Sequence, residues 1–417
     1  MLFARFLKPL MKNGTLVIVD HKGARHAVGA GAPTVTVHFH DKRLGTRLAL
    51  HPALYAGEAY MDGTLTVEGG DIFAMLDLIM ANLGAAHHHW ALRMGRSVER
   101  LVTLFNTYNP VAVSRRNVAH HYDLSGQLYE TFLDADLQYS MAYFRDPHMS
   151  LDDAQEAKID HIARKLLLEP GMRVLDIGCG WGGLALRLHH RYGARVTGIS
   201  LSENQIAVAK RRAAASGAAV EFRLQDYRHV AETFDRVVSV GMFEHVGIPH
   251  YRRFFDTVRD RLSPDGVALI HTIGRSDGPG ATDSWTQKYI FPGGYAPAMS
   301  EVVPHMERAG FFITDVEVLR LHYAKTLREW RRRFMAARPK MEKLYDARFC
   351  RMWEFFLASA ESAFYNTFHV NFQFQLSKRL EAVPITRDYM YSNNSSSHQV
   401  KSLDKVVPKT YPQAHHG

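Results

Sequence analysis

A glycine-rich segment in the middle of the chain has the residue types and spacing of a cofactor-binding loop. It reads Met-Arg-Val-Leu-Asp-Ile-Gly-Cys-Gly-Trp-Gly-Gly over residues 172–183. A short apolar run ends at the glycines and a helical pattern follows over 184–192, which predicts a buried strand, a tight turn and a helix start. Glycines let a ligand lie against the backbone, and the free amides at a helix N-terminus then face it. Asp176, at the strand end, adds a carboxylate that can attract a cation.

The glycine spacing alone leaves two kinds of cofactor open. Gly178, Gly180 and Gly183 match the G-x-G-x-x-G pattern of dinucleotide sites. The next strand, 195–200, lacks the acidic residue that binds the ribose of NAD about twenty residues on, and no Walker lysine follows the glycines. A cofactor without phosphates therefore fits better. The residues favour S-adenosylmethionine (SAM), which carries a sulfonium, an amino-acid end and an adenosine.

Alternating strand and helix patterns surround this loop. We expect helices at 154–168, 184–192, 203–216, 250–262 and 300–309. We expect strands at 172–177, 195–200, 219–224, 234–240 and 266–272, with strand-like segments near 311–325 closing the sheet. Such alternation predicts a doubly wound, parallel α/β sheet, in which ligands bind beyond the carboxyl ends of the strands. Asp176, Asp226, Glu244 and His271 fall at that edge.

The pattern of residues 1–115 predicts a separate, smaller α+β domain. Strands are expected at 15–20, 35–39 and 65–67, and Asp71 is expected to cap a helix that follows it. The SAM-binding domain is then expected over 116–390. Residues 391–417 are polar, and we predict that they are disordered or left over from cloning.

Length and composition are those of a globular protein. The chain has 417 residues, 46% hydrophobic and 22% charged, which is ample for two domains. The sequence contains no uninterrupted apolar run of about eighteen residues, so no transmembrane helix is predicted. Residues 1–10 lack the apolar core of a signal peptide. The two cysteines, Cys179 and Cys350, provide no disulfide framework, so a reducing, cytoplasmic setting is expected.

Much of the net charge of +9 lies between residues 320 and 348, where ten Lys or Arg oppose three Asp or Glu. Leu327, Trp330 and Phe334 recur there at helical spacing. Two interpretations stay open: a basic amphipathic helix on anionic lipid, or a helix docked on its own core. No nucleic-acid module accompanies the charge. The run of histidines at 87–89 is not expected to bind a metal, because adjacent histidines cannot easily aim at one ion.

Several segments together resemble the cyclopropane-fatty-acyl-phospholipid synthases, to which the mycolic acid cyclopropane synthases are related. The matching segments are 139–140, 174–183, 225–227, 239–247, 271–274 and 288–292. The resemblance spans residues 120–390, and 51–71 resembles the N-terminal extension of longer members. It implies a Rossmann-like class I SAM methyltransferase fold, with the N-terminal domain as an accessory for lipid binding or dimerisation. It also implies a homodimer that works on unsaturated phospholipid at the inner, anionic membrane surface.

The resemblance also implies site residues. The positions that match the family's SAM ligands are Tyr139, Ser140, Asp176, Gly178, Cys179, Gly180, Trp181, Gly182, Gly183, Ser200, Leu201, Ser202, Asn204, Gln205, Asp226 and Tyr227. The catalytic positions are Glu244, His271, Tyr323 and the backbone of Ile273, which in the family hold a bicarbonate ion beside the reacting carbons. No metal ion is implied.

The implied reaction moves a methylene group from SAM to the cis double bond of an acyl chain. Methyl transfer to the alkene creates a carbocation, which aromatic faces such as Phe243, Tyr289 and Tyr323 can stabilise. Bicarbonate or Glu244 then removes a proton so that the cyclopropane ring closes. If the proton left elsewhere, the product would be a methyl- or methylene-branched chain. A fatty-acyl C-methyltransferase is therefore one alternative, and a SAM- and lipid-binding protein without turnover is another.

Two positions depart from the family pattern. Met141 stands where the family usually continues Tyr-Ser-Cys, and Ala360 stands at a second family cysteine. A covalent cysteine mechanism is therefore not expected. Bicarbonate loses one contact, because a thioether is only a weak acceptor. The residues also have plain alternatives: Glu244 as a helix cap, His271 as a partner of a buried carbonyl, and Tyr323 as a core aromatic.

Overall fold

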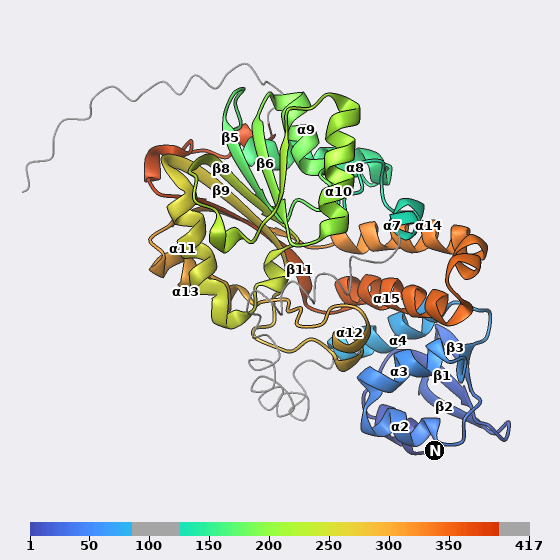
Figure 1. Ribbon diagram of the computed structural model, residues 1–417. Coiled ribbons are helices and arrows are strands. Elements are labelled where there is room, and N and C mark those ends of the chain that lie inside the picture. Colours follow the sequence, from blue (N-terminus) through green and yellow to red (C-terminus); the bar gives the residue numbers. More distant parts are fainter. Residues whose placement is uncertain (86–125, 392–417) are drawn as a thin grey trace, which may run out of the picture.

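The structure, a computed structural model, describes residues 1–85 and 126–391 (Figure 1). The expected boundary at 115/116, the histidines at 87–89 and the tail from 392 to 417 lie outside the described residues. The first described part forms a small α+β unit, as its pattern predicts. Its strands are β1 (Gly14–Val19), β2 (Arg25–Ala30), β3 (Thr34–Phe39) and β4 (Leu65–Val67), and its helices are α1 (Leu2–Leu7), α2 (Leu44–Leu50), α3 (Pro52–Met61) and α4 (Ile72–Ala85). Of these strands, β2 was not expected from the sequence.

A seven-stranded sheet forms the centre of the larger unit. Its strands are β5 (Arg173–Ile177), β6 (Arg195–Ser200), β7 (Glu221–Leu224), β8 (Phe234–Val240), β9 (Leu262–Arg275), β10 (Phe312–Leu319) and β11 (His369–Ser377), in the order β10-β11-β9-β8-β5-β6-β7. The five strands β9, β8, β5, β6 and β7 pair with one another in parallel, which confirms the doubly wound sheet. The order reverses at β5, where such sheets form ligand sites.

Helices cover both faces of this sheet because its strands are apolar on both sides. Leu175 of β5 packs with the aromatic side chains of one helical layer, whereas the neighbouring Val174 packs with the other layer. The helices of the larger unit are α7 (Gly126–Phe132), α8 (Leu151–Lys165), α9 (Gly183–Tyr192), α10 (Glu203–Ser216), α11 (Tyr251–Arg261), α12 (Ser284–Tyr289), α13 (Met299–Arg308), α14 (His322–Leu344), α15 (Ala347–Asn366) and α16 (Asp388–Tyr391). In Figure 1, α8, α9 and α10 lie on one side of the sheet and α11 and α13 on the other.

The expectation that strands over residues 311–325 close the sheet is only partly correct. Only β10 is a strand within residues 311–325, because helix α14 already begins at His322. The sheet is completed by β11, which lies between β10 and β9 and runs antiparallel to both. The sequence of β11 alternates polar and apolar residues, a pattern that could have predicted a strand. Its polar side chains are nevertheless buried, since Asn371, Gln373 and Gln375 are at most 2% exposed.

The basic segment is a helix docked on its own core. Leu327, Trp330 and Phe334 of α14 are buried, with exposures of 1% or less. The arginines of its other face reach acids elsewhere in the chain, which are Glu361 for Arg331 (2.8 Å), Asp152 for Arg333 (2.6 Å) and Glu354 for Arg338 (2.6 Å). These pairs confirm the second of the two interpretations of this segment. Within residues 1–85 and 126–391, no helix is both long enough and apolar enough to cross a membrane.

The small unit packs against α15 through α3 and α4, and α14 and α15 lie between it and the sheet (Figure 1). A close approach at Gly57 of α3 permits this docking. A Cβ atom at Gly57 would lie 2.3 Å from Nε1 of Trp285, which is itself 1% exposed and faces Sδ of Met61 at 3.2 Å. Buried packing of this kind tolerates little added volume.

We expect Gly57→Ala to lower the midpoint of thermal unfolding, because overpacking at such a site costs about 1–3 kcal/mol. Gly45→Ala is the matched control. Gly45 is also helical, but the atom nearest to its added methyl group is Cε of Met1, the end of a flexible side chain. Alanine favours the helix by about 1 kcal/mol, so Gly45→Ala should leave the midpoint unchanged or raise it. Equal midpoints for the two variants would contradict the tight contact.

Candidate active site

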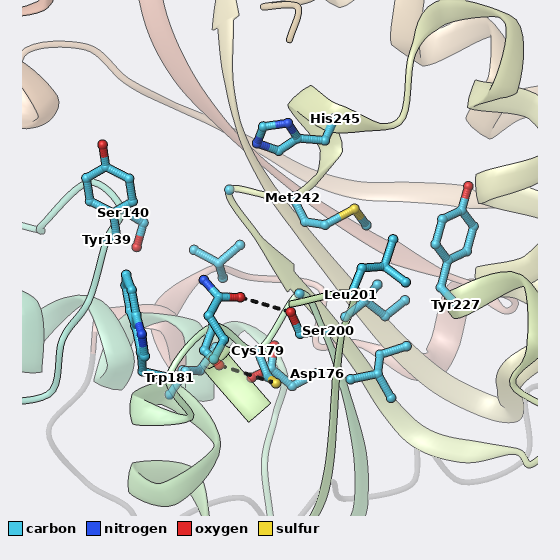
Figure 2. Close-up of a pocket in the computed structure, with 18 of the residues that line it drawn as sticks. Tyr139, Ser140, Asp176, Cys179, Trp181, Ser200, Leu201, Tyr227, Met242 and His245 are labelled. Carbon is cyan, nitrogen blue, oxygen red and sulfur yellow. Dashed lines mark hydrogen bonds between the residues drawn. The ribbon is translucent and has the colours of Figure 1, made fainter. Parts of the chain in front are cut away.

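A cavity opens at the carboxyl ends of β5, β6 and β8, at the reversal point of the sheet. Figure 2 shows Tyr139, Ser140 and Trp181 on one side of it, with Tyr227 on the other and Met242 and His245 toward the top. Thirteen of the predicted cofactor residues line it, namely Tyr139, Ser140, Asp176, Gly178, Cys179, Gly180, Trp181, Gly183, Ser200, Leu201, Gln205, Asp226 and Tyr227. The structure thus brings together segments that lie up to 88 residues apart in the sequence, from Tyr139 to Tyr227.

The glycine loop keeps the cavity open where side chains would fill it. Gly178 has a φ of +87°, and a Cβ atom there would lie 2.7 Å from Cβ of Met242. Helix α9 begins at Gly183 directly after this loop, so its first amides lie at the cavity wall. The loop and the helix start can therefore hold a ligand against bare backbone.

Asp176 contributes a buried carboxylate to the wall. It is 1% exposed, and its Oδ2 has no hydrogen-bond partner among the described residues. Burial raises the pKa of Asp176 to about 7, and the nearby Lys158 opposes this shift. A buried acceptor without a partner is costly, so this oxygen suits a cationic N–H donor of a ligand.

Polar residues at the ends of β6 and β7 are held by neighbours in the sequence. Ser200 donates to Oε1 of Gln205 at 2.9 Å, as Figure 2 shows. Asp226 accepts two side-chain bonds from Arg228, at 2.8 and 2.6 Å. Burial alone would raise the pKa of Asp226, but these bonds keep it below its usual value. The carboxylate therefore stays ionised at this end of the cavity.

Three predicted cofactor residues lie off the cavity lining. Gly182 is the N-cap of α9 with a φ of +82°, and a Cβ there would meet Phe222 at 2.6 Å. Ser202 caps α10 by accepting from the amide of Gln205 at 3.2 Å, and Asn204 is exposed. The lining also contains residues that were not predicted, among them Gln138, Arg228, Gly241, Met242 and His245. These residues could have been identified from the sequence only by their closeness to the recognised motifs.

Glu244 directly precedes His245, which lines the cavity, but Glu244 is not itself part of the lining. Its Oε1 accepts the backbone N–H of Ile273 at 2.6 Å, and its Oε2 is buried without a partner among the described residues. Burial raises the pKa of Glu244 to about 7, although the bond from Ile273 lowers it. The carboxylate is thus bound to strand β9 and does not cap a helix. A carboxylate with this pKa can exchange a proton near neutral pH.

His271 is buried in β9 between two amide side chains of β11. Gln373 lies 3.1 Å from its Nδ1 and Asn371 lies 3.4 Å from its Nε2. Burial, with the nearby charges of Lys158 and Lys165, lowers the pKa of His271 to about 3. The ring is therefore neutral. Its carbonyl oxygen accepts the N–H of Gly241 at 2.9 Å, which connects His271 to the cavity wall.

The remaining catalytic candidates lie in the large apolar cluster between the two units. Tyr323 packs on Phe364 and Trp330, with ring centres 4.8 and 5.7 Å apart, and Tyr139 packs on the same Trp330 at 5.2 Å. Ile273 and Tyr289 join this cluster. Phe243 does not, because it is fully buried against Tyr251 in the core beneath α11. None of Phe243, Tyr289 and Tyr323 lines the cavity, but Tyr289 and Tyr323 are only partly buried, whereas Phe243 has no exposed surface for a substrate cation and is removed from the candidates.

The chain is similar to several known proteins. Residues 111–374 match the family model for mycolic acid cyclopropane synthetase. The chain is 38% identical over 318 residues to cyclopropane-fatty-acyl-phospholipid synthase of Escherichia coli (strain K12), covering 76% of this chain and 81% of that protein. It is 35% identical over 362 residues to tuberculostearic acid methyltransferase UfaA1 of Mycobacterium tuberculosis, covering 82% of each. Mycolic acid cyclopropane synthase CmaA1, solved as a complex with SAH and CTAB, has a TM-score of 0.60 and 34% identity over 64% of this chain and 98% of its own.

Proposed function

This chain belongs to the mycolic acid cyclopropane synthetase family and is a SAM-dependent methyltransferase, and we propose that it converts cis double bonds of phospholipid acyl chains into cyclopropane rings. One observation carries the proposal: His245 lines the glycine-rich cavity, and the residue before it, Glu244, is a buried carboxylate whose Oε2 has no partner among the described residues. The cavity would hold SAM, and Glu244 would act where the acyl chain meets its methyl group.

In this proposal the chain mainly aligns the reactants and handles one proton. The sulfonium of SAM is a good methyl donor, whereas an alkene is a poor nucleophile, so the rate depends on holding the two close together. Tyr323 and Tyr289 are partly buried side chains packed on the large apolar cluster, and in this proposal their exposed faces would contact the acyl chain and stabilise the cation that forms. Glu244 then receives the proton whose loss allows the ring to close.

The residues around Glu244 also fit the bicarbonate ion that the family resemblance implies. The Oε2 atom of Glu244 is a buried acceptor without a partner among the described residues, and the O–H of bicarbonate would satisfy it. Tyr323 carries a hydroxyl donor that would hold the anion, and the N–H of Ile273 orients Glu244. His271 could donate to the anion only if Asn371 or Gln373, which lie on its two ring nitrogens, moved away. When bound, bicarbonate would supply a base beside the cation.

A fatty-acyl C-methyltransferase, which makes a branched chain instead of a ring, is the second candidate function. Met141 replaces the cysteine of the family and is fully buried, and one relative in this family is a tuberculostearic acid methyltransferase. Both observations favour the alternative in which the cation loses its proton elsewhere and a branched chain results. The two products have the same composition when the branch is a methylene group, so mass alone does not separate them.

Purified protein with SAM and vesicles of a defined cis-monounsaturated phospholipid should therefore yield acyl chains heavier by one CH2. Proton NMR of the product should show the strongly shielded protons of a cyclopropane ring. Olefinic or methyl-branch signals instead would establish the C-methyltransferase. SAM binding without turnover on any cis-unsaturated phospholipid would contradict both and leave a SAM- and lipid-binding protein.

We further propose that the protein works as a homodimer on the cytoplasmic face of the membrane. The net charge of +9 supports attraction to anionic lipid. Co-sedimentation with phosphatidylglycerol vesicles should fall as salt rises, because screening weakens exposed charges. Sedimentation velocity measures the oligomeric state. Salt-independent binding to neutral vesicles would count against an anionic surface.

A further inference from the structure

Two side chains of helix α8 hold the part of the cavity wall that contains Gln138 and Ser140. Nε2 of Gln155 donates to the carbonyl of Ser140 at 2.9 Å and lies 3.3 Å from that of Gln138. Nζ of Lys158 donates to Oε1 of Gln138 at 2.7 Å and to Oγ of Ser140 at 2.9 Å. Gln155 is 1% exposed and Lys158 is 0% exposed, so bulk water does not compete for these bonds. Lys158 thus supports the wall from behind.

Because Lys158 is the donor in these hydrogen bonds, Ser140 and Gln138 keep their own N–H and O–H groups for a ligand. An ammonium group only donates, so Ser140 Oγ and Gln138 Oε1 act as acceptors toward Lys158. The hydroxyl proton of Ser140 and the amide protons of Gln138 are then left for other partners. Both residues line the cavity, and Nε2 of Gln138 lies beside Gly183, where an added Cβ would be 2.5 Å away. This wall therefore presents donors backed by a buried positive charge, which suits an anionic group.

The acids that surround Lys158 are mostly engaged elsewhere. Asp134 accepts the backbone N–H groups of Gln138 (2.8 Å) and Asp136 (3.0 Å). Asp136 pairs with Arg187 at 2.6 Å and with Arg212 at 3.4 Å. Burial lowers the pKa of Lys158 to about 7, while Asp134, Asp136 and Asp176 oppose that shift. A ligand carboxylate at the wall would also raise the pKa of Lys158 and so favour the charged ammonium.

We propose that Lys158 is a positioning residue which, through Ser140 and Gln138, binds the carboxylate of the amino-acid end of SAM. The carboxylate is the one anionic group of SAM, and the donor wall is the part of the cavity that matches it. The unpartnered oxygen of Asp176, across the glycine loop, matches the ammonium group of the same amino-acid end. The inference rests on this cavity being the SAM site of the proposed function.

The test compares SAM with decarboxylated SAM, which lacks only that carboxylate. Calorimetry with the full-length protein and no lipid gives both dissociation constants, so the result does not depend on turnover. Wild type should bind SAM about 10- to 100-fold more tightly than the decarboxylated analogue, as expected for a hydrogen-bonded charge. Lys158→Met should bring this ratio close to one. Ser140→Ala should lower it in part, and the double variant should lose no more than Lys158→Met does.

Lys165→Met is the matched control. Lys165 lies seven residues further along α8 and is also 0% exposed, but its Nζ contacts Glu317 at 2.5 Å and Asp315 at 3.5 Å. Its replacement should cost stability and keep the wild-type ratio. A wild-type ratio in Lys158→Met, or an equal loss in Lys165→Met, would overturn the inference. If Lys158→Met does not fold, Ser140→Ala decides, because an unchanged ratio there also overturns it.

The inference and the proposed function can fail separately. A protein that discriminates between SAM and its analogue through Lys158, yet makes no cyclopropane product, would keep the inference and lose the function. Wild-type protein that does not bind SAM at all would overturn both.

Discussion

Glu244→Gln is expected to lower the rate of product formation by about 10²- to 10⁴-fold, the usual contribution of a positioned acid or base. The affinity for SAM should change little, because the cavity lining does not include Glu244. Glutamine keeps the shape of the side chain, and its oxygen can still accept the N–H of Ile273 that Glu244 accepts at 2.6 Å. Product analysis gives the rate, and calorimetry gives the affinity for SAM.

Glu301→Gln is the control for this exchange. Tyr295 connects the two glutamates, because its backbone N–H donates to the carbonyl of Glu244 at 3.0 Å and its hydroxyl donates to Glu301 at 2.7 Å. Glu301 also accepts the amide of Ala298 at 2.9 Å, and its variant should keep near wild-type turnover. An equal loss of SAM affinity and turnover in Glu244→Gln would make Glu244 a cofactor ligand or a structural residue instead of the proton acceptor.

The pH dependence of turnover provides a second test of Glu244. Its pKa is raised by burial to about 7, so the carboxyl group is protonated below that pH and ionised above it. Accepting a proton requires the ionised form. The rate at saturating substrate should therefore rise as pH increases through about 7, and this rise should be absent from the residual activity of Glu244→Gln. A rate that falls over the same interval would indicate that the protonated form is the active one.

Gly178→Ala is expected to weaken SAM binding by about 10- to 100-fold, the equivalent of overpacking at a tight contact. The added methyl group would lie 2.7 Å from Cβ and 2.8 Å from Cγ of Met242, and both residues line the cavity. Either Met242 moves into the space for the ligand or the loop itself shifts. Calorimetric titration with SAM measures the loss.

Gly171→Ala is the control that distinguishes the effect of backbone strain from the effect of the clash with Met242. Gly171 has a similar φ of +84°, but no atom lies within 4 Å of its Cβ position. Both variants should lose stability, because a left-handed backbone disfavours alanine by about 1–2 kcal/mol. SAM affinity should fall in Gly178→Ala alone. An equal decrease in both variants would attribute the effect to strain in place of the contact with Met242.

Local patterns in the sequence were enough to predict the scaffold of the cavity. The predicted helix 203–216 and strand 234–240 coincide with α10 and β8, and the glycine loop lies between β5 and α9 as expected. These features are determined by hydrophobic period and by the backbone freedom of glycine, which both act over a few residues. The sequence did not predict β11, and it extended the strand pattern beyond Leu319 into what is helix α14.

The sequence could not predict where α14 docks, because its docking depends on residues that are distant in the chain. Its basic and apolar residues fit a membrane-surface helix and a buried one equally well, because both present the same amphipathic pattern. Burial of Trp330 and the pairing of Arg331 with Glu361 at 2.8 Å, in the next helix, decide between them.

The sequence by itself determined the glycine loop, the parallel sheet around it and the family to which their motifs point, because each is encoded by residues close together in the chain. Only the tertiary structure decided what surrounds the chemical groups. It placed the amide of Ile273 on Glu244, the amides of Asn371 and Gln373 on His271, and Lys158 behind Ser140. The pKa of a carboxylate or an ammonium depends on such burial and on partners far away in the sequence. For that reason the charge states at this site follow from the fold and not from the motifs.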